Sequence, residues 1–233
     1  MKLVWLGHSA FRIETGSSVL LIDPFLTGNG VFEASGMPAD EASAGVTQIA
    51  LTHGHDDHIG DTVAIAKKTG AKVIAPYELA LYLNAQGVEN VDPGNPGGTL
   101  DQGDYDVSFV RACHSAATMV DGRPIYLGAA CGLVVRPKEG PTIYHMGDTE
   151  IFSDMALVNE IFAPKIGLVP IGDRFTMGAR TAAMACEKYF KFDTVIPIHY
   201  GTFPIIDQTP DKFLAAATGQ NVVVLKVGEA LEL

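Results

Sequence analysis

Short apolar runs rich in β-branched residues recur along the chain, and glycine, proline and polar residues separate them. This pattern is typical of strands. We predict strands at residues 2–6, 10–15, 18–24, 47–53, 72–76, 105–112, 129–137, 142–148, 166–172, 194–199 and 221–227. The polar, glycine-rich stretch 28–45 is predicted to be a long loop.

Helices are predicted between several of these strands. Asp61 can cap the start of a helix over 61–70, and Gly70 can end it. The other predicted helices are residues 77–87, 178–192 and 210–219. Strands that alternate with helices indicate an α/β fold, and a sandwich of two sheets with helices outside fits the order better than an alternating barrel. No linker interrupts the pattern, so we expect a single domain over residues 1–233.

Composition limits the classes of protein that the chain can belong to. With 233 residues, 47% of them hydrophobic and 18% charged, it fits a globular protein with a sizeable core. The net charge of −11 repels phosphate backbones, so nucleic acid is not an expected partner. No apolar run reaches about 18 residues, so no membrane span is expected. The three cysteines form no C-x-x-C pair and the N-terminus does not resemble a signal peptide, so we expect a cytoplasmic protein.

Three histidines fall within six positions in the sequence LTHGHDDHIGD, residues 51–61, directly after a predicted strand. They belong to a pattern H-x-H-x-D-H that consists of His53, His55, Asp57 and His58. Imidazole nitrogens and carboxylate oxygens are good ligands for zinc and similar divalent ions. His53 and His55 can point the same way in an extended loop, whereas Asp57 and His58 come after the chain turns. One short loop can therefore contribute to two adjacent metal sites.

Further candidate ligands lie at the ends of later predicted strands, at His114, Asp148 and His199. They are so distant in sequence that only the fold can bring them to the histidine cluster. A carboxylate has two oxygens, so Asp148 is best placed to bridge two ions. Open positions would remain on each ion for water and substrate, as in catalytic sites. We predict two sets of terminal ligands, namely His53, His55 and His114 for one ion and Asp57, His58 and His199 for the other.

Each of these residues also has a less specific interpretation. A single histidine such as His114 or His199 is more often structural than a metal ligand. For the cluster this interpretation is weak, because neither packing nor capping requires three imidazoles within six positions. Asp56 is not needed to explain the motif, and we expect a solvated or capping carboxylate there. Asp61 is expected to cap a helix.

The motif THGHDDHIGD, followed by His114, by Asp148 in GDT and by His199, resembles the metallo-β-lactamase superfamily over nearly the whole chain. The sequences GHSAFRIE, LLIDPF, YHMGDT and PIGDRFTMG are also similar to small metal-dependent hydrolases related to L-ascorbate-6-phosphate lactonase. The resemblance implies a four-layer αβ/βα sandwich with a dinuclear site at the sheet edges. Proteins of this branch tend to follow FTMG with proline and an acidic residue, whereas Ala179 and Arg180 follow here, a departure that concerns the substrate.

Four more residues are candidates for supporting the site or holding the substrate. Asp23 can accept the second N–H of a ligand histidine, or it only organises the turn that follows. The resemblance suggests that His8 reaches the mouth of the pocket, and an ordinary turn histidine is the alternative. Arg174 and Arg180, in the loop 171–180, could hold an anionic group, although solvated loop charges are the commoner outcome.

We therefore expect a metal-dependent hydrolase that activates water with two divalent ions and acts on a small ester, lactone or phosphodiester. Asp57 and Asp148 are the expected catalytic residues. Zinc suits the ligands best, and manganese, iron or nickel can also occupy such sites. The alternatives are a nuclease or RNA-processing enzyme of the same superfamily and a non-catalytic metal-binding protein. The net charge counts against the first, and the complete set of ligands against the second. Family analogy suggests a homo-oligomer.

Overall fold

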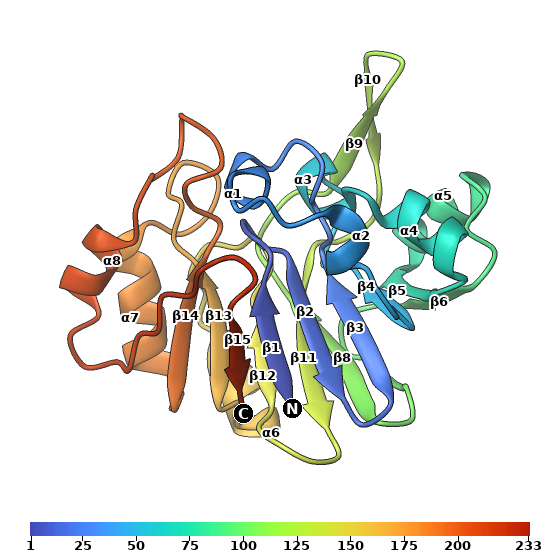
Figure 1. Ribbon diagram of the computed structural model, residues 1–233. Coiled ribbons are helices and arrows are strands. Elements are labelled where there is room, and N and C mark those ends of the chain that lie inside the picture. Colours follow the sequence, from blue (N-terminus) through green and yellow to red (C-terminus); the bar gives the residue numbers. More distant parts are fainter.

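Two large sheets pack face to face in the computed structural model, which describes all residues from 1 to 233 (Figure 1). The first sheet has the order β15-β1-β2-β3-β4-β5-β6 and the second the order β14-β13-β12-β11-β8-β7. The strands of the first sheet are β1 (Lys2–Trp5), β2 (Phe11–Thr15), β3 (Ser18–Ile22), β4 (Gln48–Ala50), β5 (Lys72–Pro76), β6 (Val91–Gly94) and β15 (Ala230–Glu232). Those of the second are β7 (Thr99–Asp101), β8 (Tyr105–Arg111), β11 (Cys131–Pro137), β12 (Ile143–His145), β13 (Ile166–Pro170) and β14 (Thr194–Ile198).

Eight helices surround the sheets, and α4, α5 and α7 show how they pack. Neighbouring side chains of a strand point to opposite faces of the sheet. In strand β3, side chains on both faces are buried. Leu20 and Ile22 join a core of 38 buried residues between the sheets, which continues to α7. Leu21 joins a second core of 20 residues, under α4 and α5. The helices are α1 (Gly30–Ala34), α2 (Ala39–Ala42), α3 (Asp56–Ile59), α4 (Thr62–Thr69), α5 (Tyr77–Ala85), α6 (Met155–Phe162), α7 (Ala179–Tyr189) and α8 (Asp211–Ala216).

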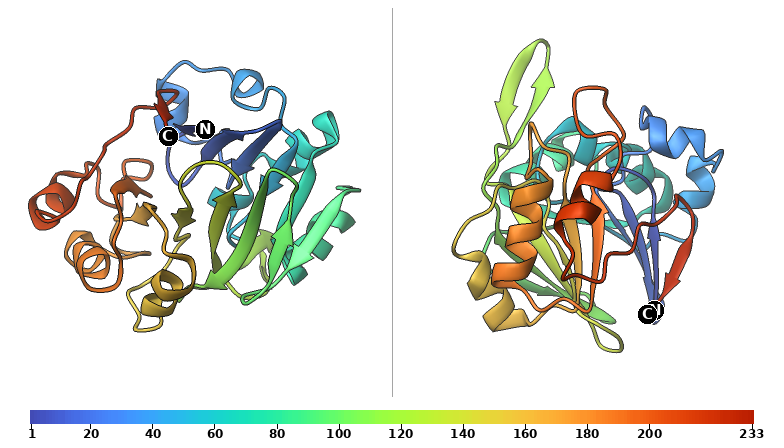
Figure 2. Two further views of the ribbon diagram at one scale, coloured as in Figure 1. Left: turned by 90° about the horizontal axis from the view of Figure 1, so that it is seen from below. Right: turned by 90° about the vertical axis from the view of Figure 1, so that its left-hand side faces the viewer.

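These layers form the αβ/βα sandwich that was predicted. In Figure 2 the two sheets lie between α4 and α5 on one side and α6 and α7 on the other. Strands β3 to β6 pair in parallel, and so do β12, β13 and β14. Strand β8 runs in the same direction as β12, because both pair with β11 in an antiparallel manner. The loops that follow these strands therefore leave each sheet at a common edge. None of the helices combines the length and apolarity that a membrane crossing needs.

Several predicted elements differ from those observed. The expected loop 28–45 contains α1 and α2, because Asn29 caps α1 by accepting the N–H groups of Val31 and Phe32. The predicted strand 221–227 is wrong: only one isolated bridge forms there, between Val222 and Val195, and the final strand comes later, at β15. Helix α6 and strands β6, β7 and β15 were missed.

A protruding hairpin of β9 (Ala117–Val120) and β10 (Arg123–Tyr126) was also missed (Figure 1). Its turn is Asp121-Gly122, with φ values of 49° and 74°. A two-residue turn with positive φ at both positions matches the right-handed twist of a hairpin, and Asp-Gly is a preferred sequence for it. The sequence therefore held a recognisable signal for this element.

Candidate metal centre

The histidine motif begins where β4 ends and continues into the single turn of α3. His55 accepts backbone N–H bonds from His58 and Ile59, at 3.0 and 2.9 Å, and these bonds form the turn. His53 and His55 thus precede the helix, whereas His58 lies on it. Gly54 is needed between them, because a Cβ there would lie 2.7 Å from Cβ of Leu127. This turn separates the motif into two halves, as the spacing predicted.

The structure brings all seven predicted ligands together, with His8 as an eighth candidate. They form two clusters, and within each cluster the candidate ligand atoms all lie within 4.8 Å of one another. The first cluster is His53, His55, His114 and Asp148, and the second is His8, Asp57, His58 and His199. The six terminal ligands divide as predicted from the sequence, while His8 is additional and Asp148, predicted to bridge, falls within the first cluster.

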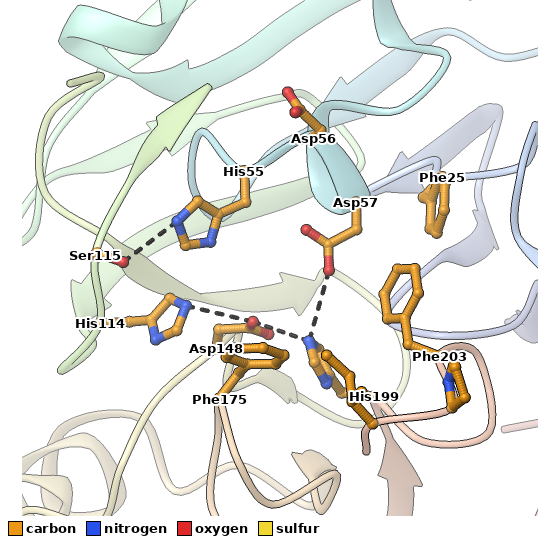
Figure 3. Close-up of a pocket in the computed structure, with 12 residues that line it drawn as sticks. Phe25, His55, Asp56, Asp57, His114, Ser115, Asp148, Phe175, His199 and Phe203 are labelled. Atoms are coloured by element: carbon orange, nitrogen blue, oxygen red, sulfur yellow. Dashed lines mark hydrogen bonds and ion pairs between the residues drawn. The ribbon is translucent and has the colours of Figure 1, made fainter. Parts of the chain in front are cut away.

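Asp148 lies between the two clusters (Figure 3). Its Oδ2 is 3.5 Å from Nε2 of His114 in the first cluster and 3.0 Å from Nε2 of His199 in the second. Its Oδ1 is 3.3 Å from Nε2 of His58. A carboxylate with its two oxygens directed to both clusters has the placement that a bridging ligand needs.

Unpartnered polar atoms point to a cation at this place. Nε2 of His58, Oδ1 of Asp148 and both ring nitrogens of His199 are buried and form no directed hydrogen bond. Buried polar groups in native proteins nearly always have a partner, and leaving one unpaired costs about 1–3 kcal/mol. Imidazole and carboxylate are suitable ligands for a divalent ion. The residues present therefore fit a metal site.

The electrostatics prepare the groups for metal binding. Burial, reinforced by the charge of His58, lowers the pKa of His53 well below its usual value, so this imidazole is neutral and can act as a ligand. Burial alone would raise the pKa of Asp148, but the charges of His199 and His58 outweigh it and hold this pKa well below its usual range. Burial is likewise outweighed at Asp57, where His58 and His8 lower the pKa. Both carboxylates are therefore ionised.

Asp23 contacts the candidate ligand His58, in the arrangement that one of its two predicted roles requires. The Asp23 side chain is completely buried, and its Oδ2 lies 2.7 Å from Nδ1 of His58. The same carboxylate accepts the backbone N–H of Thr52 at 2.9 Å and the Thr52 hydroxyl at 2.6 Å. A fixed Nδ1 leaves Nε2 of His58 free to face the cluster, which is how carboxylates orient histidine ligands.

His8 lies deeper than the sequence suggested. It is completely buried and does not line the cavity, so its predicted place at the pocket mouth is wrong. Its Nε2 lies 3.0 Å from Oδ2 of Asp57, and its Nδ1 is 2.9 Å from the hydroxyl of Thr202. Burial and the charge of His199 lower the pKa of His8 to about 4. The neutral imidazole therefore fixes the orientation of Asp57 from the buried side of the site.

Three site residues have backbone conformations that side chains rarely adopt. The φ angles of His8, Asp23 and His199 are 53°, 45° and 59°. Such conformations cost of order 1–3 kcal/mol each and concentrate at functional sites. Gly172 lies against the last of them, since a Cβ there would be 2.1 Å from the carbonyl oxygen of His199. The loop after β13 thus needs glycine to approach the candidate ligand His199, which directly follows β14.

The remaining aspartates of the motif have structural contacts. Asp56 is exposed, accepts the hydroxyl of Thr118 on the hairpin and borders the cavity. Asp61 sits at the N-cap position of α4 but makes no capping bond, so the predicted capping contact is wrong. Its carboxylate instead accepts the N–H groups of Leu26 and Thr27 and the Thr27 hydroxyl, at 2.7 to 2.9 Å. Asp61 therefore holds the loop after β3 against the start of α4.

The clusters open into a cavity of about 730 Å³ (Figure 3). Neither Arg174 nor Arg180 lines it. Arg174 is exposed, with its guanidinium carbon 5.6 Å from the ring centroid of Phe175, and Arg180 borders a separate hollow near Lys212. The predicted role of both arginines in holding an anion thus has no counterpart in the cavity wall. The residues that line the cavity are Phe25, His55, Asp56, Asp57, His114, Ser115, Asp148, Phe175, His199, Phe203, Pro204 and Ile205.

Sequence analysis missed the apolar part of this wall. Phe25, Phe175 and Phe203 lie in loops, each just after a predicted strand that ends at the site. In a sequence, an aromatic residue at such a position looks like a core residue. Only its place at the end of a strand that also carries candidate ligands could have identified it as part of the cavity wall.

Comparisons with known proteins agree with this geometry. Residues 19–200 match the family model described as beta-lactamase superfamily domain. A protein of Methylocella silvestris named metal-dependent hydrolase is 61% identical over 224 residues, which are 96% of this chain and 95% of that protein. A metal-dependent hydrolase of Rhizobium meliloti is 56% identical over the whole of both chains. The structure of Igni18, a metallo hydrolase from Ignicoccus hospitalis, superposes with a TM-score of 0.86 at 30% identity and covers 100% of this chain and 98% of its own.

Proposed function

The chain belongs to the beta-lactamase superfamily, as a metal-dependent hydrolase, and from this premise we propose that it uses two divalent ions to hydrolyse a small ester, lactone or phosphodiester. The observation that carries this proposal is the position of Asp148, whose two oxygens face ligands of both clusters. The narrower similarity to L-ascorbate-6-phosphate lactonase stays a prediction.

The proposed ligands are the seven residues predicted from the sequence. Five imidazoles and two carboxylates suit zinc, and manganese, iron or nickel can also bind such a set. Asp148 would serve both ions. The terminal ligands would be His53, His55 and His114 for one ion and Asp57, His58 and His199 for the other.

Two divalent ions held by these residues would supply Lewis acidity, which would lower the pKa of water towards about 7 and polarise the oxygen of the group under attack. The chain supplies the geometry and the charge. Asp23 and His8 fix the orientations of His58 and Asp57, so neither has to reorganise during the reaction. Asp57 is ionised and 24% exposed, and it faces the cavity together with Asp148. We propose these two carboxylates as the catalytic residues.

Other features of the proposal concern the protein's setting. We propose that residues 1–233 act as one domain in the cytoplasm and that copies of the chain assemble into a homo-oligomer. A nucleic acid substrate is disfavoured, since no lysine or arginine lines the cavity and the net charge is −11.

The test combines metal removal with substitution of ligands. Hydrolysis of a lactone panel and of bis(4-nitrophenyl) phosphate is measured on zinc-loaded, chelated and reloaded protein. We expect activity that chelation abolishes and reloading restores, and losses of at least about 100-fold in Asp57→Ala and His114→Ala. Asp40→Ala is the control, because its side chain is 80% exposed. Full activity after chelation, or in both ligand variants, would refute the proposal.

A further inference from the structure

We propose that the cavity takes a substrate that carries a neutral aromatic or similarly flat apolar group, and that Phe25, Phe175 and Phe203 bind this group. The inference rests on the proposed function, because the apolar wall adjoins the metal clusters. It specifies which part of a substrate the wall recognises, whereas the clusters act on the bond that is broken.

The aromatic side chains come from three separate loops that meet at one cavity. Phe25 follows β3, Phe175 follows β13 and Phe203 follows β14. Pro204 and Ile205 continue the wall beside Phe203. Local sequence preference alone does not explain why apolar side chains from three distant segments meet around one opening. The fold itself therefore builds an apolar wall at this place.

Contacts with His8 fix the wall to the second cluster. The rings of Phe25 and Phe203 are nearly parallel, with an interplanar angle of 22° and centroids 6.2 Å apart. The His8 ring meets both edge to face, with centroid distances of 5.8 and 5.4 Å. The same His8 donates to Asp57. A substrate whose reacting atom lies at Asp57 and Asp148 would thus place its neighbouring group against these rings.

Part of the apolar wall is exposed, because no other part of the chain covers it. Phe175 and Ile205 are 49% and 54% exposed, and Phe25 and Phe203 are partly exposed. Apolar side chains that border a concave site with a few polar groups are typical of small-molecule pockets, and the cavity of about 730 Å³ lies within their usual size range. Burial of such surface is worth about 25 cal/mol per Å². A ligand with an apolar group gains this energy, whereas a small polar ligand does not.

The polar and charged residues show where the rest of a substrate would lie. Figure 3 shows His55, His114 and Ser115 on one side of Asp148, with Phe25 and Phe203 on the other. None of the residues that line the cavity is a lysine or arginine, and Asp56 and Asp57 carry negative charge at its border. A substrate with a phosphate or carboxylate beside the wall would find no lysine or arginine there to pair with. The wall therefore favours a neutral group.

Hydroxamates test the inference by binding, without any need for turnover. Isothermal titration of zinc-loaded protein compares acetohydroxamate, phenylacetohydroxamate and succinic acid monohydroxamate, which share the metal-binding group. We expect the phenyl compound to bind roughly 10- to 100-fold more tightly than the methyl compound, and the charged one to gain nothing. Phe203→Ala and Phe175→Ala should reduce the phenyl gain at least about threefold and leave acetohydroxamate binding unchanged. Tyr77→Ala is the control, since Tyr77 is 48% exposed but lies outside the cavity.

Each outcome decides between the two proposals. Equal affinity of the methyl and phenyl compounds, or tighter binding of the charged one, would overturn the inference and leave the proposed hydrolase intact. A phenyl gain that survives both phenylalanine substitutions would also overturn it. Failure of all three compounds to bind, with no zinc retained by the protein, would refute the metal site and the inference together.

Discussion

Oδ2 of Asp23 lies 2.7 Å from Nδ1 of His58, and both side chains are completely buried. The two residues are 35 positions apart and follow neighbouring parallel strands, Asp23 in the loop after β3 and His58 on α3 after β4. Asp23 has φ of 45°, so its backbone is held in a costly conformation where its carboxylate meets the histidine. This pair links the first sheet's loops to the proposed metal ligands.

The first prediction concerns this pair. In Asp23→Asn, the side chain keeps its shape but loses the carboxylate charge that fixes the His58 ring. We expect zinc affinity to fall about 10- to 100-fold, as for other partners of ligand histidines. A competition titration against a chelator of known affinity measures the change, with Asp40→Asn as the exposed control. Unchanged zinc affinity in Asp23→Asn would show that the pair has no role in metal binding.

Close packing at Gly172 gives a second prediction. An added methyl group would lie 2.1 Å from the carbonyl oxygen and 3.0 Å from Nδ1 of His199, so the ligand must move. We expect Gly172→Ala to lower the free energy of unfolding by about 1–3 kcal/mol and to weaken zinc binding. Urea unfolding and the same competition titration measure both. Gly219→Ala is the control, because its Cβ would have open space. Equal behaviour of the two variants would contradict the prediction.

A third prediction concerns Asp61 and distinguishes the role of the aromatic wall from that of the metal clusters. Asp61→Ala removes three hydrogen bonds that hold the loop carrying Phe25. We expect a loss of about 1–3 kcal/mol in the free energy of unfolding and weaker phenylacetohydroxamate binding, with zinc content unchanged. Asp101→Ala is the control, because its carboxylate accepts a single N–H in a turn. A normal affinity for the phenyl compound would contradict the role given to this loop.

Metal removal should also change thermal stability. Without ions, Nε2 of His58, Oδ1 of Asp148 and the ring nitrogens of His199 stay buried without a directed hydrogen bond. An ion that binds only the folded state stabilises it, by about 2.7 kcal/mol at 100 times its Kd. We expect the Tm in calorimetry to fall by several degrees on chelation and to return on reloading with zinc. An identical Tm in both states would contradict binding at these clusters.

Most of the proposed metal ligands could be predicted from the sequence, but little of the cavity wall could. His53, His55, Asp57 and His58 were recognisable because their chemistry is concentrated in one short motif, and residues at strand ends must meet at one sheet edge. The cavity wall was not recognisable, because Phe203 looks like a core residue until its loop is placed. The same limit applied to the fold.

Short apolar runs bounded by turn residues predicted the central strands of the fold. The same pattern did not predict the strands at the edges of the sheets correctly. Strand β7 has only three residues, and residues 221–227 are apolar enough for a strand yet pair through a single bridge at Val222. Edge pairing depends on which neighbours the fold provides, and local sequence does not encode that.

The central claim is that seven side chains bind two ions, and metal stoichiometry tests it most directly. Purified protein is loaded with zinc, desalted and analysed by inductively coupled plasma mass spectrometry. We predict two zinc ions per chain in the wild type and about one in His53→Ala, which removes a ligand of the first cluster. One ion or none in the wild type would contradict the two-metal site.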